Sequence, residues 1–320
     1  MQFVVTGAAG FIGSCLVSHL NRAGVDELLL VDDFTKKKKQ KNLENKKFKE
    51  LVDRKEYLQN LHRYPKAKII FHLGARTDTT LQDKKTFNEL NLEYSKGLWA
   101  YASKNKIPFI YASSAATYGD GTLGFDDEQP IDRYQPLNLY GQSKHDFDRW
   151  VLSQKEQPIF WAGFKFYNVY GPNEYHKERM ASVVFHAFHQ IIQSKMVKLF
   201  KSHREGFSDG EQKRDFIYVK DLCQTLFTCA DKSGESAIYN LGTGQARTFK
   251  DLALAVFSAL QINPQIEYID TPKDIRNRYQ YFTQATTSKL LGQGWIEKFQ
   301  DLENGIEDYV KNYLKPKNYL

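Results

Sequence analysis

The 320-residue sequence has only three cysteines and lacks any long apolar run. Cys15, Cys223 and Cys229 are widely spaced, odd in number and without the CxxC or histidine-paired spacing of a metal site. We therefore interpret them as reduced core residues and expect no metal site. No segment approaches the roughly 20 apolar residues that a membrane span requires. Residues 2–6 lead directly into a glycine turn, which predicts that no signal peptide is present. These absences together favour a cytoplasmic protein with no membrane partner.

The net charge of +7 is the compositional feature that most invites a functional interpretation. Much of the excess lies in a lysine run at residues 36–39, with further lysines up to residue 49. A solvated lysine-rich surface is one interpretation, and a negatively charged nucleotide ligand is the alternative. Basic motifs interleaved with aromatic residues are lacking, so we expect no nucleic-acid partner.

Strand-like and helix-like segments alternate through the first half of the chain. Apolar strands are predicted at residues 2–6, 27–31, 69–73, 109–112 and 160–166, and helices at 11–23, 87–104 and 140–154. This alternation predicts an α/β fold with a doubly wound parallel sheet covered by helices on both faces.

The pattern changes after Asn168, where the glycine-proline pair at 171–172 interrupts it. Further helices are predicted at 181–192, 221–230 and 249–260, and strands at 214–219, 239–243 and 266–269. We expect a first domain at 1–167 with returning segments at about 214–240 and 283–300. A smaller, interwoven C-terminal α/β lobe would comprise 168–213 and 241–282, with a C-terminal helix at 299–313.

Residues 6–13, TGAAGFIG, join the first strand to the first helix with GxxGxxG spacing. Gly7 permits the tight turn, Gly10 lets a pyrophosphate approach the backbone, and Gly13 lets helix and strand pack closely. The free amides at the helix N-terminus would then bind the phosphates. This arrangement predicts a Rossmann-type dinucleotide site, whose contacts at the loop are Gly7, Gly10, Phe11, Ile12 and Gly13.

The acid that follows the second strand supports the same site. Asp32 stands 19 residues after Gly13, where it can accept hydrogen bonds from the adenosine ribose. Asp32 and Asp33 by themselves favour NAD, because two carboxylates repel a 2′-phosphate. The lysine run just beyond them could reverse this preference by pairing with that phosphate. Both cofactors stay open at this point.

Tyr140 and Lys144 are four residues apart on a predicted helix, so both heads can point into one cleft. A free tyrosine has a pKa of about 10, and a nearby ammonium and a positive nicotinamide would both lower it. Lys144 can also hold the nicotinamide ribose. Ser114, at the end of an earlier strand, could hydrogen-bond the substrate oxygen whose proton Tyr140 exchanges. The pair therefore predicts hydride chemistry.

The segments TGAAGFIG, SSAATYG, YGQSK and FYNVYGP together resemble the extended short-chain dehydrogenase/reductase family of nucleotide-sugar enzymes, over essentially the whole chain. The resemblance implies an NAD(P) cofactor and a small nucleotide-sugar substrate. Dehydratases of this family carry an Asp-Glu pair where this chain has Ala115 and Ala116. Two methyl groups have no proton to give a leaving hydroxyl, so dehydration is disfavoured.

Later segments narrow the resemblance to the nucleotide-heptose 6-epimerases of the family. They are His176-Lys177, residues 180–186, residues 213–216 and residues 278–285. The resemblance implies a tightly held NADP, with NAD as the alternative, and a homo-oligomer that is pentameric in the family. It also implies epimerisation of ADP-glycero-manno-heptose at C6″ through a transient ketone, for lipopolysaccharide inner-core precursor synthesis. Tyr140 and Lys177 would be the bases on the two sides of the substrate.

The resemblance also implies contacts residue by residue. Beyond the glycine loop and the two aspartates, the cofactor contacts would be Lys39, Arg54, Leu73, Gly74, Ala75, Asn91, Tyr140, Lys144, Val169 and Lys177. The substrate contacts would be Ser114, Asn168, Arg179, His186, Arg214 and Tyr279.

Two features depart from the family pattern: Arg179 replaces a small serine, and the loop at 202–212 is longer and more charged. Both lie near the expected substrate lobe, where they could alter contacts to the sugar or phosphate rather than the class of reaction. One alternative is a nucleotide-hexose 4-epimerase of the same family, which would not need Lys177. Another is a non-catalytic NAD(P) sensor, against which the Tyr140–Lys144 pair argues.

Overall fold

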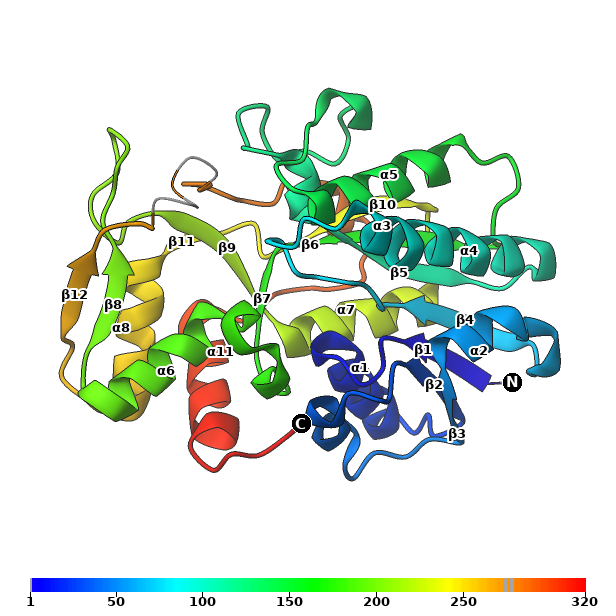
Figure 1. Ribbon diagram of the computed structural model, residues 1–320, viewed down its shortest axis with the longest axis horizontal. Helices are drawn as coiled ribbons and strands as arrows, with labels where there is room; N and C mark the ends of the chain where they lie inside the picture. Colours follow the sequence, from blue (N-terminus) through cyan, green and yellow to red (C-terminus); the bar gives the residue numbers. More distant parts are fainter. Residues whose placement is uncertain (1, 273–275, 277–278) are drawn as a thin grey trace.

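A seven-stranded sheet forms the centre of the protein in the computed structural model, which describes residues 2–272, 276 and 279–320. Its strands run in the order β10-β6-β5-β4-β1-β2-β3 (Figure 1). They are β1 (Gln2–Thr6), β2 (Leu28–Asp32), β3 (Glu50–Asp53), β4 (Ala67–His72), β5 (Phe109–Ser114), β6 (Trp161–Phe166) and β10 (Ala237–Leu241). All neighbours pair in parallel. The predicted doubly wound sheet is therefore confirmed, and its order reverses between β1 and β4, where such sheets place their ligands.

Helices cover both faces of this sheet. Against one face lie α1 (Phe11–Arg22) and α7 (Val219–Lys232), and against the other lie α4 (Tyr94–Asn105) and α5 (Leu139–Ser153) (Figure 1). Alternate residues of a strand point to opposite faces, so Val5 packs with the first pair of helices and Val4 with the second. Burial on both faces explains why the strands read as continuous apolar runs.

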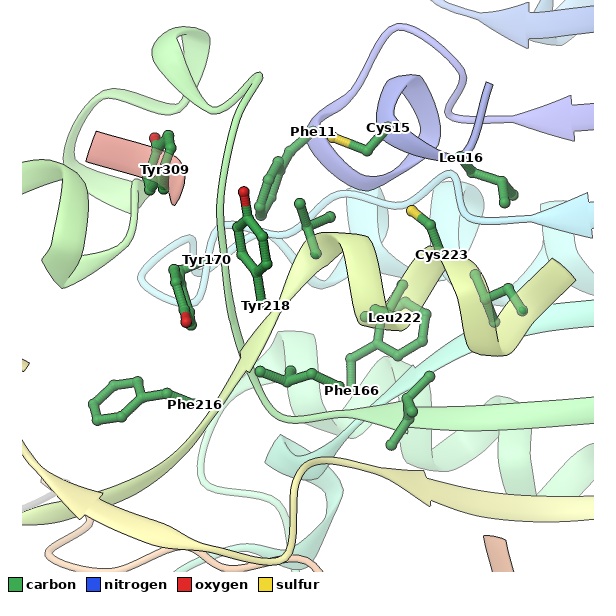
Figure 2. Close-up of a cluster of buried hydrophobic side chains, with 14 of the residues drawn as sticks. Phe11, Cys15, Leu16, Phe166, Tyr170, Phe216, Tyr218, Leu222, Cys223 and Tyr309 are labelled. Atoms are coloured by element: carbon green, nitrogen blue, oxygen red, sulfur yellow. The ribbon is translucent and has the colours of Figure 1, made fainter. Parts of the chain in front are cut away.

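The core continues from the first face into the second lobe. Figure 2 shows Phe11 and Cys15 of α1 close to Cys223 of α7, with Phe166, Tyr170, Phe216 and Tyr218 along the path to Tyr309. All three cysteines are buried and free. Because the cluster crosses between lobes, the two parts of the chain share one apolar interior.

The second lobe contains two small sheets. One has the order β11-β9-β7, from β7 (Asn168–Tyr170), β9 (Lys213–Tyr218) and β11 (Ala246–Thr248), and the other pairs β8 (Val197–Phe200) with β12 (Ile266–Ile269). Its helices are α6 (Val183–Ser194), α8 (Phe249–Leu260) and α11 (Leu302–Tyr309), the last continued by a π-helical turn at Val310–Leu314. Since β10 returns to the main sheet, the chain does pass back and forth as expected. The lobe boundaries themselves stay a prediction, and residues 273–275 and 277–278, which include part of the quoted 278–285 segment, lie outside the described residues.

Several elements differ from the sequence-based expectation. The helix predicted at 87–104 comprises α3 (Lys84–Phe87), a π-helical turn at Asn88–Glu93 and α4. Within that turn Asn91 bonds the backbone of Arg76, and Ser95 donates to the carbonyl of Asn91, so side chains compete with the regular ladder. Short segments such as β3, β7, β8 and β11 were not predicted, because three or four residues carry too little periodicity.

The remaining helical segments are short and connect the larger elements. They are α2 (Arg54–Gln59), α10 (Ser288–Gly292) and 3-10 turns at Lys37–Leu43, Leu61–Arg63, Ala115–Tyr118, Ile131–Arg133 and Tyr175–Met180. Throughout the described ranges, no helix is both long enough and apolar enough to cross a bilayer.

Candidate active site

A cleft of about 1050 Å³ opens along the carboxyl ends of β1, β2, β4 and β5, where the strand order reverses. It brings together residues that the sequence analysis selected from widely separated segments. The selected residues that line this cleft are Gly7, Gly10, Phe11, Ile12, Gly13, Asp32, Lys39, Arg54, Leu73, Gly74, Ala75, Ser114, Tyr140, Val169, Lys177 and Arg179. The fold therefore gathers most of the expected contacts around one cavity.

The glycine loop at residues 7–13 contributes to the lining of this cleft. Gly7 has a φ of +70°, and a Cβ placed on it would lie 2.6 Å from the Cα of Gly74. A Cβ on Gly13 would lie 2.1 Å from the carbonyl oxygen of Gly7. Helix α1 starts at Phe11, and its N-cap Gly10 has no side chain to bond the first amides. These amides can therefore bind an anionic group in the cleft.

Acids and cations alternate where the adenosine end of a dinucleotide would lie. Asp32 accepts hydrogen bonds from the amide of Ala9 at 2.9 Å and from Lys39 Nζ at 3.1 Å. Arg54 lies 3.7 Å from the carboxylate of Asp33, which does not itself line the cleft. Lys36 also lines the cleft, and burial followed by the neighbouring Lys39 lowers its pKa. Both carboxylates are thus paired with a cation, and a further cation is close by.

Tyr140 and Ser114 both line this cleft, and their side chains lie within hydrogen-bonding reach of each other. Helix α5 begins beside them because Asn138 caps it by accepting from the amide of Gly141 at 2.8 Å. Burial raises the pKa of Tyr140, whereas its hydrogen bond with Ser114 lowers it. An additional cation is therefore needed to favour the phenolate near neutral pH.

Lys144 lies behind this wall of the cleft. Its side chain is only 4% exposed and donates to the carbonyl of Ala112 at 2.7 Å. Burial lowers the pKa of Lys144 to about 8, although the carboxylate of Asp148 opposes this. The ammonium is therefore held close to the Ser114 strand.

Lys177 lines the same cleft from a different element, the 3-10 turn Tyr175–Met180. Its Nζ lies 4.8 Å from the centroid of the Phe11 ring. Burial lowers the pKa of Lys177, while the buried carboxylate of Glu174 raises it. The next residue in this turn, Glu178, has a φ of +51° and pairs with Lys38 from the lysine run. The turn is thus tied to the adenosine end of the cleft.

A second cleft of about 430 Å³ contains Arg214 and Tyr279, together with Ala116, Asn138 and Gln280. The Arg214 guanidinium is 7% exposed and lies 5.3 Å from the Tyr279 ring and 5.6 Å from the Phe249 ring. It donates to the carbonyls of Lys213, at 2.9 Å, and Gln280. Within the described residues no carboxylate forms an ion pair with it. Arg214 is therefore a buried cation suited to an anionic ligand.

The two clefts share the loop at residues 77–82 as a wall. Arg179 lines the first cleft, lies 3.4 Å from Asp78 and bonds Thr80, which lines the second. The sequence analysis selected nothing in this loop beyond Ala75. Its position directly after the carboxyl end of β4 is the signal that could have identified it.

Three other selected residues lie outside the clefts. Asn91 is buried behind the wall, where its amide bonds the backbone of Arg76 and the hydroxyl of Ser143 at 2.9 Å. Asn168 is exposed on β7, and His186 is half-buried on α6. Neither lines either cleft. His176, by contrast, lines the first cleft, bonds Asn42 at 3.1 Å and has its pKa lowered to about 4 by burial.

Comparison with known proteins agrees with this geometry. A model of the NAD dependent epimerase/dehydratase family matches residues 3–242. A relative from Fusobacterium nucleatum, named ADP-L-glycero-D-manno-heptose-6-epimerase, is 44% identical over the full length of both chains. A relative with the same name from Nitratidesulfovibrio vulgaris is 43% identical over 98% of each chain.

Solved structures give the same result. The crystal structure of the Helicobacter pylori protein of that name has a TM-score of 0.82 and 29% identity, covering 97% of this chain and 95% of its own. A UDP-glucose 4-epimerase from Thermotoga maritima also has a TM-score of 0.82, but at 24% identity it shows the fold alone. The family match begins in β1 and extends through β10, and thus includes every strand of the central sheet. The chain belongs to the NAD dependent epimerase/dehydratase family.

Proposed function

We propose that the protein epimerises ADP-glycero-manno-heptose at C6″, converting the D-glycero into the L-glycero form. The observation that carries this proposal is that Tyr140 and Lys177, from separate elements, line the same cleft. Two proton carriers on different elements could serve the two faces of the carbinol carbon during inversion, and Tyr140 and Lys177 are the candidates for these roles. The names of the full-length relatives supply the substrate.

The cleft fits a nicotinamide dinucleotide, and we propose NADP as the preferred form, with NAD as the alternative. Gly7 and Gly13 leave no room for a Cβ against the backbones of Gly74 and Gly7, so the loop and α1 pack as closely as a dinucleotide-binding turn requires. Asp32 and Asp33 are neutralised by Lys39 and Arg54, which removes their repulsion of a 2′-phosphate. The loop residues 7–13 would hold the pyrophosphate, and Leu73, Gly74, Ala75 and Val169 would pack along the cofactor.

A bound nicotinamide would supply reversible hydride transfer at C6″, and the side chains of the cleft would handle the proton of the C6″ hydroxyl. Tyr140 takes the proton of the C6″ hydroxyl as the carbon is oxidised, and Ser114 hydrogen-bonds the resulting carbonyl oxygen. After the sugar turns, Lys177 gives a proton to that oxygen as the carbon is reduced. Lys144 keeps a positive charge near the phenolate and holds the nicotinamide ribose. The substrate regains the hydride and the proton that it lost, and proton exchange with water returns Tyr140 to phenolate and Lys177 to ammonium for the next turnover.

The substrate would lie across both clefts. Arg214, stacked beside Tyr279, would bind the diphosphate through its fork of N–H donors. Arg179 would contribute at the shared loop, with Asn168 and His186 as more distant contacts. Ala116 lines the second cleft where family dehydratases carry an acid, which disfavours loss of water.

A nucleotide-hexose 4-epimerase is the second candidate, because Tyr140, Lys144 and Ser114 would serve that reaction equally well. Only the role of Lys177 separates the two. A sensor that binds NAD(P) without catalysis is disfavoured by the half-buried Tyr140, which would have no use in it.

The deciding experiment follows ADP-heptose by NMR before and after addition of the protein. We expect the two C6″ epimers to interconvert, with no solvent deuterium entering C6″, since the hydride returns directly. Tyr140→Phe and Lys177→Ala should each lower the rate by at least about 100-fold, the lower range for a general acid or base. Tyr101→Phe and Lys104→Ala, remote from the cleft, are the matched controls. Full activity of both active-site variants, or turnover of UDP-hexoses alone, would overturn the proposal.

We further propose a first domain at 1–167 with returning segments at about 214–240 and 283–300, and a second lobe at 168–213 and 241–282 with a C-terminal helix at 299–313. We also propose a homo-oligomer and a cytoplasmic location. The three free cysteines support a reducing compartment. The product would serve as a lipopolysaccharide inner-core precursor. Mass spectrometry of the nucleotide that copurifies distinguishes NADP from NAD, and light scattering gives the oligomer size.

A further inference from the structure

Helix α5 carries a third ionisable side chain on the same face as Tyr140 and Lys144. Asp148 follows Lys144 by four residues, as Lys144 follows Tyr140, so the three share one helix face. Tyr140 borders the cleft, Lys144 lies behind it, and Asp148 is 0% exposed within the protein. The mechanism above does not use Asp148.

The carboxylate of Asp148 receives three hydrogen bonds from two strands of the central sheet. Tyr111 and Ser113 of β5 donate at 3.0 Å and 2.6 Å, and Lys165 of β6 donates at 2.8 Å. Lys165, itself 3% exposed, also donates to Thr117 at 2.7 Å. A buried charge persists only when it is paired and hydrogen-bonded, and this pair satisfies both conditions.

These contacts surround the strand end that carries Ser114. Ser113 precedes it, and Thr117 lies in the 3-10 turn Ala115–Tyr118 that follows it and also donates to the Ser114 carbonyl at 2.8 Å. The Asp148–Lys165 pair therefore joins the helix face of Tyr140 and Lys144 to the segment of Ser114. Its geometry fixes the spacing of groups that must act together.

The pair is also oriented toward the site. Asp148 raises the pKa of both Lys144 and Tyr140, whereas Lys165 lowers the pKa of His145, on which Asp146 and Arg149 of the same helix also act. Four further titratable groups around this layer are neutral near pH 7. They are His72 of β4, whose pKa is lowered to about 3, Tyr111 of β5 and Tyr118, whose pKa values are raised by burial, and His145 of α5, whose pKa is lowered by burial.

We propose that Asp148, held by Lys165, is a positioning residue for the epimerase reaction: it fixes Tyr140 and Lys144 against the Ser114 strand and sets the electrostatic potential in which they exchange protons. The inference rests on the proposed function, because it assigns these two side chains their part in proton transfer.

The test is Asp148→Asn, with Asp146→Asn as the matched control. Asp146 lies on the same helix, is half-buried and, among the described residues, accepts a side-chain hydrogen bond from Gln142 alone. Its variant therefore makes the same change of charge away from the pair. In Asp148→Asn, the pKa of Lys144, followed through its ¹³Cε resonance, should fall by about one unit. The acid limb of the kcat/KM profile should move to lower pH by about the same amount. Asp146→Asn should move neither.

A merely structural Asp148 would give a different result: lower kcat at every pH, with the acid limb and the Lys144 resonance unmoved. That result would overturn the proposal. If Asp148→Asn fails to fold because its amide faces three donors, Asp148→Asn with Lys165→Gln lets the two amides pair and leaves no lone charge. The double variant should shift the Lys144 resonance in the same direction but by less, because the opposing charge of Lys165 is removed as well, and the absence of a shift would likewise refute the proposal.

The two readouts also separate this inference from the proposed function. The Lys144 titration needs no substrate, so it decides the electrostatic role even if ADP-heptose is not turned over. Failure of the wild-type protein to epimerise ADP-heptose would count against the proposed function alone.

Discussion

Replacing Gly13 by alanine should damage both the fold of the glycine loop and its ability to bind a cofactor. The new Cβ would lie 2.1 Å from the carbonyl oxygen of Gly7, 2.8 Å from the carbonyl carbon and 3.0 Å from the Cα of Ala8. Carbon and oxygen atoms normally approach to about 3.3 Å, so roughly 1.2 Å must be made up. All three obstacles are backbone atoms, and none can rotate away.

Gly7 has little freedom to withdraw from such a methyl group. Its amide donates to the carbonyl of Val31 at 2.8 Å, and the backbone of Gly74 lies against its Cα. Overpacking of this kind costs about 1–3 kcal/mol of unfolding free energy, and a rigid backbone contact puts Gly13→Ala near the upper end, at about 3 kcal/mol. The amides of the first helical turn would shift with the loop, which should weaken dinucleotide binding by about 10–100-fold, equivalent to about 1.4–2.7 kcal/mol.

Urea unfolding and calorimetric titration with NADP measure the two effects. Gly292→Ala in α10 is the matched control, because its Cβ would meet no atom within 4 Å. We expect that variant to unfold within about 1 kcal/mol of the wild type. Wild-type stability and cofactor affinity in Gly13→Ala would refute the reasoning from close approach.

Three further outcomes are expected. Burial lowers the pKa of His72 to about 3, below its unfolded value of about 6.5, so the protein should lose stability as the pH falls from 6.5 toward 3. In His72→Gln, the slope of unfolding free energy against pH should decrease by about 1.4 kcal/mol per pH unit over this range. Equal slopes in the two proteins would contradict this expectation. Arg214→Met should raise KM for the nucleotide sugar at least about tenfold, as expected for the loss of a charged hydrogen bond. Its free energy of unfolding in urea should change by less than about 2 kcal/mol, because the methionine can still pack between the two rings. An unchanged KM would show that Arg214 serves packing alone. Arg179→Ser should change the free energy of unfolding by less than about 1 kcal/mol, because the Arg179 side chain is 68% exposed in its ion pair with Asp78. A larger change in urea titration would show that the loop at 77–82 depends on Arg179 for its stability.

Much of the central sheet and its glycine loop was predictable because the signals are local. The apolar run of β1, the turn at Gly7 and the amphipathic α1 follow one another within 22 residues, and each is visible in the sequence. The spacing of Tyr140 and Lys144 likewise fixes their common helix face. The π-helical turn at Asn88–Glu93 was missed because it depends on Asn91 bonding a distant loop, which no local pattern encodes.

The sequence predicted which residues belong to the candidate site better than it predicted how their side chains are arranged. Most of the selected residues line one cleft, yet Lys144 and Asn91 lie behind its wall with their polar groups bonded to protein. The sequence analysis did not select Asp148, because its proposed role depends on hydrogen bonds to partners on β5 and β6 that form when the chain folds.

The sequence by itself determined the strand–loop–helix unit, the paired side chains of α5 and the absence of acids at Ala115 and Ala116, since each depends on neighbours a few residues apart. Tertiary structure alone decided that Lys39 neutralises Asp32, that Lys177 lies over Phe11 and that Lys165 pairs with Asp148. These contacts join separate elements, and their strength depends on distance and burial after packing. Charge and spacing along the chain cannot fix either quantity.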